Sequence, residues 1–310
     1  MTLDVDLVEH LESLDTHVRN EFLAMPDVVK AGDDLDFSKI PIQARRWVRI
    51  DDVVAVVADL KGSTNLGTGS QREASTASIY EAATNPLVNT LATFSADDIA
   101  IQGDGAFGVF WGEKRYERAI CAGITIKTFS QKSLEARLEK KWPELPTTGF
   151  KVGLASSRVL VKKVGIPRTD FYEEVWAGKA VNYATKASQE ADRRELIVTG
   201  SVWDIVGQND FVAYSCTCHN GPSDSIWNDV VIERLPEDEP ERIGRRLTSS
   251  WCDKCGPEYC EAILSGQTTR PDVADLRKAA QSALMRDAIR MKAKNERENR
   301  RNLRIARSGT

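Results

Sequence analysis

Long apolar runs are missing from this sequence of 310 residues. The longest is the six-residue stretch Val53–Ala58, whereas a membrane-spanning helix needs about 18 or more apolar residues. The first residues include Asp4, Asp6 and Glu9 rather than a basic stretch followed by an apolar one, so no secretory leader is expected. The sequence therefore predicts a protein without a membrane span.

Cysteine is also scarce: the chain has six, and five of them lie between positions 216 and 260. Six are too few for a disulfide scaffold in a chain of this size, so a cytoplasmic protein with reduced thiols is expected. Apolar residues make up 41% of the chain and charged residues 28%. These are ordinary values for a globular protein, and they exclude a wholly disordered or fibrous chain.

Acidic residues outnumber basic ones in most of the chain, and an excess of positive charge is found at its C-terminal end. The whole sequence has a net charge of −4, whereas residues 272–310 carry eleven Lys and Arg against five Asp and Glu. A dedicated nucleic-acid binder usually lines a groove of its folded domain with basic residues. Nucleic acid is therefore not the expected partner. The tail is interpreted as a solvated helix that packs on the body or on a second subunit, with an acidic partner as the alternative.

Four segments of the chain differ in their residue pattern. Residues 1–44 are predicted to form a helical arm, because apolar residues recur every three or four positions over 3–25. A central domain follows at 45–206, then a Cys-rich segment at 207–270 and a basic C-terminal helix at 271–310. The Cys-rich segment has little periodicity, so it is predicted as a small, loop-rich extension.

The central segment alternates predicted strands and helices. Val53–Ala58 indicates a buried strand. Ile99–Gln102 and Phe107–Trp111 flank Gly103-Asp104-Gly105 and predict a β-hairpin with a tight turn. Further elements are expected as helices over 113–141 and 178–192 and as strands over 150–154 and 158–164. The order β-α-β-β-α-β predicts an α+β fold, a split βαβ sandwich with a mostly antiparallel sheet and helices.

Two aspartates stand at the ends of these predicted elements. Asp59 follows the buried strand and precedes a glycine-containing loop, and Asp104 occupies the hairpin turn. The first strand and the hairpin are neighbours in such a fold, so the two carboxylates can converge. Hard oxygen ligands beside free backbone N–H groups suit Mg²⁺ or Mn²⁺ with a triphosphate. Taken singly, each aspartate is alternatively a helix cap or part of a common turn.

Three blocks, Ala58–Thr64, Ile101–Gly105 and Gly178–Asn182, resemble in order and separation the motifs of class III nucleotidyl cyclases. The resemblance implies a cyclase homodomain and a head-to-tail homodimer with active sites at the interface. It implies that Asp59, Leu60 and Asp104 hold two Mg²⁺ or Mn²⁺ ions, and that the 3′-hydroxyl of a bound NTP attacks its α-phosphate. The products would be a 3′,5′-cyclic nucleotide and pyrophosphate. The residues implied to bind the nucleotide in this loop are Leu60, Lys61, Gly62, Ser63 and Thr64.

The resemblance places the second half of each active site on the partner subunit. Asn182 matches the ribose-orienting Asn of the family, and Lys186 stands where the family usually has a transition-state Arg. The spacing of four residues keeps both on one helix face. Lys supplies the charge but not the planar two-pronged fork of Arg. Arg193 or Arg194 is therefore an alternative, as is a solvated, non-catalytic Lys186.

The purine-reading pair of the family is missing from this chain. Its two positions fall on Ala100 and Val175, and neither side chain can form a hydrogen bond. The chain resembles the bacterial Pycsar pyrimidine cyclases of antiphage defence in this departure, in its Asp-Leu-Lys-Gly-Ser-Thr loop and in its Cys/Trp-rich extension. The resemblance implies UTP, or alternatively CTP, as substrate and a cyclic messenger read by a separate effector. Trp176 is predicted to fill the space beside a small base.

Other functions stay open at this point. A purine cyclase with a non-standard base pocket is one alternative. An inactive cyclase-like module that binds a nucleotide or nucleic acid is another. Two converging carboxylates speak against the second alternative, because they would repel phosphate unless a cation lies between them.

The late cysteines form close pairs that suit a zinc ion. Soft thiolates favour tetrahedral Zn²⁺, and a loop-rich segment gains stability from such a metal. The predicted ligands are Cys218, Cys252 and Cys255 with either Cys216 or Cys260 as the fourth. Reduced thiols in a small core are the alternative.

Overall fold

The computed structural model describes residues 5–32, 45–63, 73–144, 147–166, 168–218 and 221–283, together with residues 285, 286, 290, 292 and 296. Within these residues the strands are β1 (Asp27–Lys30), β2 (Arg46–Leu60), β3 (Asp98–Gln102), β4 (Gly105–Phe110), β5 (Phe150–Gly165), β6 (Tyr172–Gly178), β7 (Leu196–Val198), β8 (Trp227–Val231) and β9 (Ile243–Leu247). The α-helices are α1 (Leu7–Leu23), α2 (Glu73–Thr93), α3 (Arg115–Phe129), α4 (Ala136–Lys141), α5 (Lys179–Glu190), α6 (Gly200–Val206), α7 (Asp210–Ala213) and α8 (Gly256–Ser265). No helix of the described residues combines the length and the apolar character that crossing a bilayer requires.

One mixed sheet organises these elements. Its strand order is β3-β4-β2-β5-β7-β9-β8, with β1 added beside β2 and β6 beside β5. The β1–β2 and β5–β7 pairs are parallel and the other pairs are antiparallel. The strands β8 and β9 of the Cys-rich segment join this sheet through the pairing of β9 with β7. The predicted α+β fold with a mostly antiparallel sheet is confirmed.

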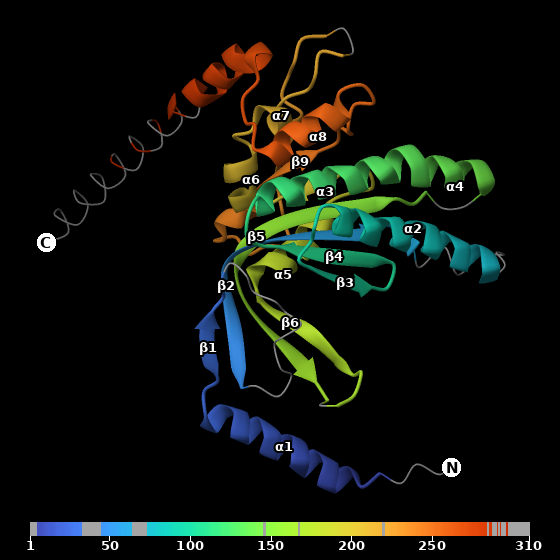
Figure 1. The fold of residues 1–310 in the computed structure, drawn as a ribbon, viewed down its shortest axis with the longest axis vertical. Coiled ribbons are helices and arrows are strands. Elements are labelled where there is room, and N and C mark those ends of the chain that lie inside the picture. Colours follow the sequence, from blue (N-terminus) through green and yellow to red (C-terminus); the bar gives the residue numbers. More distant parts are fainter. Residues whose placement is uncertain are drawn as a thin grey trace, which may run out of the picture.

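The central strand β2 is buried on both faces, which explains its unbroken apolar run. Val54 and Val56 face a core formed with α2, α3, α6 and α8. Val53 and Ala55 face a second core formed with α5. Figure 1 shows α3 above the sheet and α5 below it. The sheet is therefore a rigid middle layer, and its strand ends can hold side chains in fixed positions.

The predicted helix over 113–141 is present but not regular. The π-helical segment η3 (Ser130–Glu135) separates α3 from α4. The Ser130 hydroxyl donates to Glu135 Oε1 at 3.0 Å and accepts from the backbone N–H of Phe150 at 2.8 Å. The wider π-helical turn therefore places the Ser130 hydroxyl where it accepts a hydrogen bond from Phe150, the first residue of β5.

The prediction of separate strands over 150–154 and 158–164 is wrong, because β5 runs through both without a break. Ser156 and Ser157 lie opposite Val54 and Val53 of β2, and the Ser156 hydroxyl shares a hydrogen bond of 2.8 Å with Ser201. The serines between the two predicted strands therefore continue the strand and do not interrupt it.

The two ends of the described chain lie far from each other. The helix α1 has no buried residue and lies at one end of the molecule, joined to the sheet through β1 (Figure 1). At the other end, a 3-10 turn η5 (Pro271–Val273) starts a helical stretch over 274–283, beside α7 and α8. The rest of the predicted basic helix falls largely outside the described residues.

Candidate active site

The two predicted metal ligands come from neighbouring strands. Asp59 is the penultimate residue of β2, and Asp104 lies in the turn between β3 and β4. Ala58 pairs with Ala106 of β4. A Cβ atom placed on Gly105 would lie 2.6 Å from the carbonyl oxygen of Ala58 and 3.3 Å from the Cα of Asp59. The turn that carries Asp104 therefore packs directly on the backbone of Asp59.

The charges around these aspartates favour a cation. Asp104 Oδ2 is buried and has no hydrogen-bond partner among the described residues, and a buried carboxylate oxygen in that state is costly. Lys151 of β5 lies opposite Asp59, and its Nζ is 2.7 Å from Asp59 Oδ2. This ion pair involves Asp59 alone and leaves the Asp104 oxygen without a partner. The donor set and the unpartnered oxygen fit a divalent cation such as Mg²⁺ or Mn²⁺.

Sequence reasoning missed Lys151, because its role depends on strand register. It lies 92 positions from Asp59 in the chain, and only the β2–β5 pairing brings the two together. No local motif marks it.

Burial of Leu60 and a backbone hydrogen bond of Lys61 fix the start of the loop after Asp59. The Leu60 side chain is buried in the first core, with 2% of its surface exposed. The Lys61 N–H donates to the Gly149 carbonyl at 3.0 Å. The Lys61 ammonium forms an ion pair with Asp192, and this contact lowers the pKa of that carboxyl. Gly62 has a φ of +72° in the left-handed region.

The predicted nucleotide loop is therefore described only in part. Ser63 lies at its last described position, and Thr64 lies outside the described residues.

The residues predicted to act from a partner subunit lie on α5. The Asn182 side-chain amide donates to the Gly178 carbonyl at 2.9 Å. The Lys186 ammonium lies 5.6 Å from the centre of the Tyr183 ring. Within the described residues, no hydrogen bond or ion pair joins Asn182 or Lys186 to Asp59 or Asp104.

Arg193 and Arg194 are both engaged elsewhere. Arg193 Nη1 and Arg194 Nε lie 2.9 Å and 2.6 Å from Glu135 Oε2, and the Glu135 side chain is only 1% exposed. Moving either arginine would weaken the pairing of a buried carboxylate. The alternative in which they replace the family arginine loses support, and Lys186 stays the candidate.

The candidate base-binding residues divide between the two faces of the sheet. Ala100 and Trp176 both pack against the second core. Val175 precedes Trp176 on β6, points to the opposite face and is 41% exposed. The structure therefore brings Trp176, and not Val175, to the face that carries Ala100.

Asp98 joins this face and was missed in the sequence. Trp176 Nε1 donates to Asp98 Oδ2 at 3.0 Å, and the Trp176 ring lies 5.9 Å from that of Trp111. Burial raises the pKa of Asp98, and the nearby Glu174 carboxylate raises it further. The available signal was spacing, because Asp98 lies two residues before Ala100 on one strand and so shares its face.

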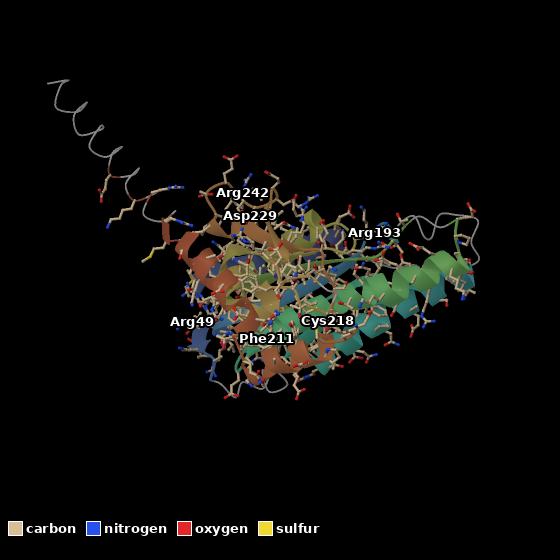
Figure 2. The ribbon with its side chains drawn as sticks, turned by 90° about the horizontal axis from the view of Figure 1, so that it is seen from above. Arg49, Arg193, Phe211, Cys218, Asp229 and Arg242 are labelled. Carbon is tan, nitrogen blue, oxygen red and sulfur yellow. The ribbon has the colours of Figure 1, made fainter. Side chains whose placement is uncertain are left out.

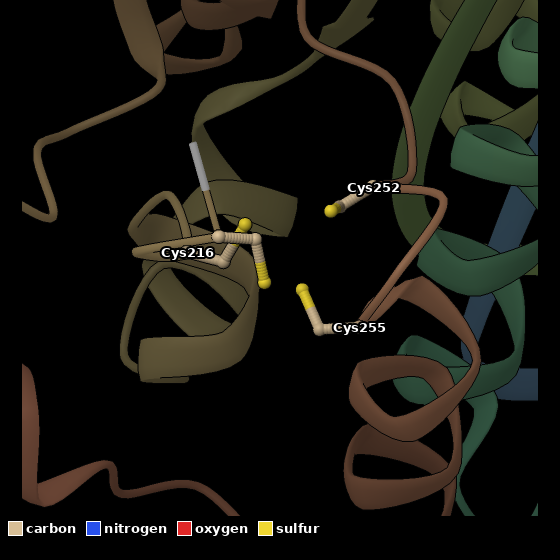
Figure 3. Close-up of side chains that lie close together, drawn as sticks. Cys216, Cys252 and Cys255 are labelled. Atoms are coloured by element: carbon tan, nitrogen blue, oxygen red, sulfur yellow. The ribbon is translucent and has the colours of Figure 1, made fainter. Parts of the chain in front are cut away.

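The cysteines form two separate groups. The sulfur atoms of Cys216, Cys218, Cys252 and Cys255 all lie within 4.8 Å of one another, and Figure 3 shows them converging from two loops. Cys260 is hydrogen-bonded to the buried Cys121 instead. The structure therefore places Cys216, and not Cys260, in the group with Cys218, Cys252 and Cys255.

Comparison with solved structures defines the class of the fold. The guanylyl cyclase Cya2 aligns with a TM-score of 0.50 and 14% identity over 66% of this chain and 95% of its own. A class III adenylyl cyclase-like ATP-binding protein from Pseudomonas aeruginosa aligns with a TM-score of 0.53 and 15% identity, over 90% of this chain and 53% of its own. Together with the paired aspartates, these similarities identify the fold as that of the class III cyclases.

Sequence relatives define the family more closely. A uridylate cyclase of Micromonospora echinofusca is 55% identical over 96% of this chain and 97% of that relative. A uridylate cyclase of Propioniciclava tarda is 45% identical over 96% of both chains. No family model matches the chain. The chain belongs to the uridylate cyclase family and is a nucleotidyl cyclase, as the sequence motifs predicted.

Proposed function

We propose that this enzyme converts UTP into 3′,5′-cyclic UMP and pyrophosphate, by attack of the ribose 3′-hydroxyl on the α-phosphate. The observation that carries the reaction class is the buried, unpartnered Oδ2 of Asp104, in a turn that packs on the backbone of Asp59. The assignment of the base is supported by the names of the two relatives that match nearly the whole chain. Ala100 and Val175, at the positions of the family's purine-reading pair, have side chains that form no hydrogen bonds.

Two Mg²⁺ or Mn²⁺ ions are the proposed cofactors, held by Asp59 and Asp104 with the backbone of Leu60. When bound, such ions would activate the attacking hydroxyl and neutralise the leaving pyrophosphate. Lys151 is proposed to orient the Asp59 carboxylate through its contact of 2.7 Å. Lys61, Gly62, Ser63 and Thr64 are proposed to bind the triphosphate through the backbone of their loop.

A homodimer is proposed to complete each active site. Asn182 and Lys186 would act on the nucleotide held by the partner, Asn182 orienting the ribose and Lys186 placing a positive charge near the reacting phosphate. This is supported by the exposure of Asn182 and by the absence of bonds from either side chain to Asp59 or Asp104 in the described chain.

The base pocket is proposed to lie against Trp176. A pyrimidine has one ring, and the indole fills the additional space that a purine would need. Asp98 orients the indole through the bond from Trp176 Nε1. CTP is the second candidate substrate, since it has the same ring size.

The proposed role of the product is that of a second messenger in antiphage defence. The enzyme would work in the cytoplasm, and a separate effector protein would bind the cyclic nucleotide.

Product analysis tests the proposal. Purified protein is incubated with all four NTPs and Mn²⁺, and the products are separated by mass spectrometry. We expect cyclic UMP as the main product, and a loss of at least about 100-fold in Asp104→Asn. Asp229→Asn is the matched control, because Asp229 lies on the outermost strand β8 (Figure 2) and pairs with Arg245.

Other outcomes separate the alternatives. A dominant cyclic AMP or cyclic GMP product would remove the pyrimidine assignment and leave the cyclase intact. No product from any NTP, with UTP still bound, would favour an inactive nucleotide-binding module.

A further inference from the structure

Four cysteines meet at a point outside the proposed active site. Cys216 and Cys218 follow α7, whereas Cys252 and Cys255 lie in the loop between β9 and α8. Their sulfur atoms all lie within 4.8 Å of one another. In a tetrahedral site with Zn–S bonds of about 2.3 Å, the sulfurs are about 3.8 Å apart. The observed spacing thus needs only a small contraction to close around one ion.

The loop between β9 and α8 is shaped to hold thiolates. The backbone N–H groups of Cys255 and Lys254 donate to the Cys252 sulfur. Cys255 occupies the N-cap of α8 without a side-chain capping bond, where the helix dipole favours negative charge. Backbone donors around a Cys-x-x-Cys turn stabilise charged sulfur ligands, and this turn has them before any metal binds.

Other uses of the four thiols fit less well. No disulfide joins any of the six cysteines in the structure. Disulfides would join the sulfurs in two pairs and not in one group of four, and a Cys-x-Cys bridge is too short for relaxed geometry. An iron–sulfur cluster places its cysteine sulfurs around several atoms, further apart than a single ion does. Among the residues that the structure describes, no hydrogen bond or ion pair links Asp59 or Asp104 to this group.

We propose that Cys216, Cys218, Cys252 and Cys255 bind one structural Zn²⁺ that fastens the segment after α7 to the loop before α8.

The loop before α8 is itself anchored to the first core. The Trp251 indole donates to Thr125 Oγ1 at 2.9 Å, and its backbone N–H donates to Thr128 Oγ1 at 3.0 Å. Lys132 Nζ donates to the Trp251 carbonyl at 2.7 Å. The zinc ion therefore connects the 216–218 segment, which has little regular structure, to α3 and η3. The ion would thus join two segments that are far apart in the sequence into one framework.

Metal analysis of the full-length protein tests the proposal. The protein is purified without chelators from zinc-containing medium, and its metals are measured by mass spectrometry. We expect one zinc per chain in the wild type and in Cys260→Ser, whose thiol pairs with Cys121. We expect less than about a tenth of that in the double variant Cys252→Ser/Cys255→Ser, because two of the four ligands are gone.

Cobalt substitution keeps the test valid if the double variant does not fold. Wild-type protein is stripped with a chelator and a thiol reagent and then reloaded with Co²⁺. We expect the visible absorption of tetrahedral Co²⁺ with sulfur ligands, and a Tm that falls by about 5 °C or more on stripping and returns with Zn²⁺ but not with Mg²⁺. These readouts need no nucleotide, so they are independent of the product that the enzyme makes.

Three results would overturn the proposal. The first is a wild-type protein that contains no metal and has an unchanged Tm. The second is a protein that contains iron and acid-labile sulfide instead of zinc. The third is a zinc content that is the same in the double variant as in the wild type.

Discussion

At the scale of single residues, the alternation of β6 decides which side chain borders the proposed base pocket. Val175 and Trp176 are adjacent, yet a strand sends neighbouring side chains to opposite faces. Trp176 reaches the face of Ala100 and bonds Asp98, whereas Val175 is exposed. Val175, which matches a base-reading position of the family by its sequence spacing, therefore lies on the opposite face of the sheet from Trp176.

Trp176→Ala is expected to raise the KM for UTP by about tenfold with a smaller change in kcat. The substitution removes the surface against which the base would pack, and base stacking on an aromatic ring is worth about 1–3 kcal/mol. Steady-state kinetics with UTP measures the effect, and Val175→Ala is the control with an expected change below twofold. Equal effects of the two substitutions would contradict the placement of the base.

At the scale of elements, Gly153 lets α5 lie directly on β5. A Cβ atom at this position would come within 2.1 Å of the Ala184 carbonyl oxygen and 2.3 Å of the Ser188 nitrogen. Both contacts are backbone atoms of α5, which cannot move without shifting the helix. Since Asn182 and Lys186 lie on the same helix, the absence of one methyl group sets the position of both proposed catalytic side chains.

Gly153→Ala is expected to lower the free energy of unfolding by about 1–3 kcal/mol, as overpacked cores do, and to reduce UTP turnover by more than tenfold. Turnover is expected to fall because the added methyl group displaces α5, which carries Asn182 and Lys186, from its packed position on β5. Thermal unfolding and product formation are measured on the same preparation. Gly221→Ala is the control, because nothing lies within 4 Å of its added Cβ. Unchanged activity in a folded Gly153→Ala protein would show that α5 takes no part in catalysis.

At the scale of the whole molecule, α1 is an amphipathic helix that the rest of the described chain leaves uncovered. No residue of α1 is buried, although apolar side chains recur along one stripe of it. The exposed stripe consists of Leu7, Leu11, Leu14, Val18 and Phe22. An exposed apolar face of this kind marks a contact surface. A second copy of the chain is the proposed occupant, because the proposed active site needs a partner subunit.

Leu11→Asp/Leu14→Asp is expected to shift the protein from dimer to monomer and to lower cyclase activity in parallel. Two charges in the stripe would have to be buried at the subunit contact, which costs several kcal/mol. Light scattering coupled to size-exclusion chromatography gives the mass. Ser13→Asp/Asn20→Asp introduces the same charge on the opposite face of α1 and is expected to stay dimeric. A variant that is monomeric and fully active would refute the shared active site.

The sequence alone determined the features that depend on neighbouring residues. The buried strand at Val53–Ala58 and the hairpin turn at Gly103-Asp104-Gly105 followed from apolar runs and turn residues. The three ordered motifs predicted the family, which the relatives confirm. Such signals act over a few positions, so they can be read without knowing how the chain folds.

Only the tertiary structure decided which distant residues meet. The contacts of Lys151 with Asp59 and of Trp176 with Asp98 depend on strand register and on side-chain facing. The choice of Cys216 over Cys260 depends on where the loops before and after β8 and β9 lie. Each pairing joins segments that are far apart in the chain, and its stability comes from packing across the whole sheet. No local pattern in the sequence records that arrangement.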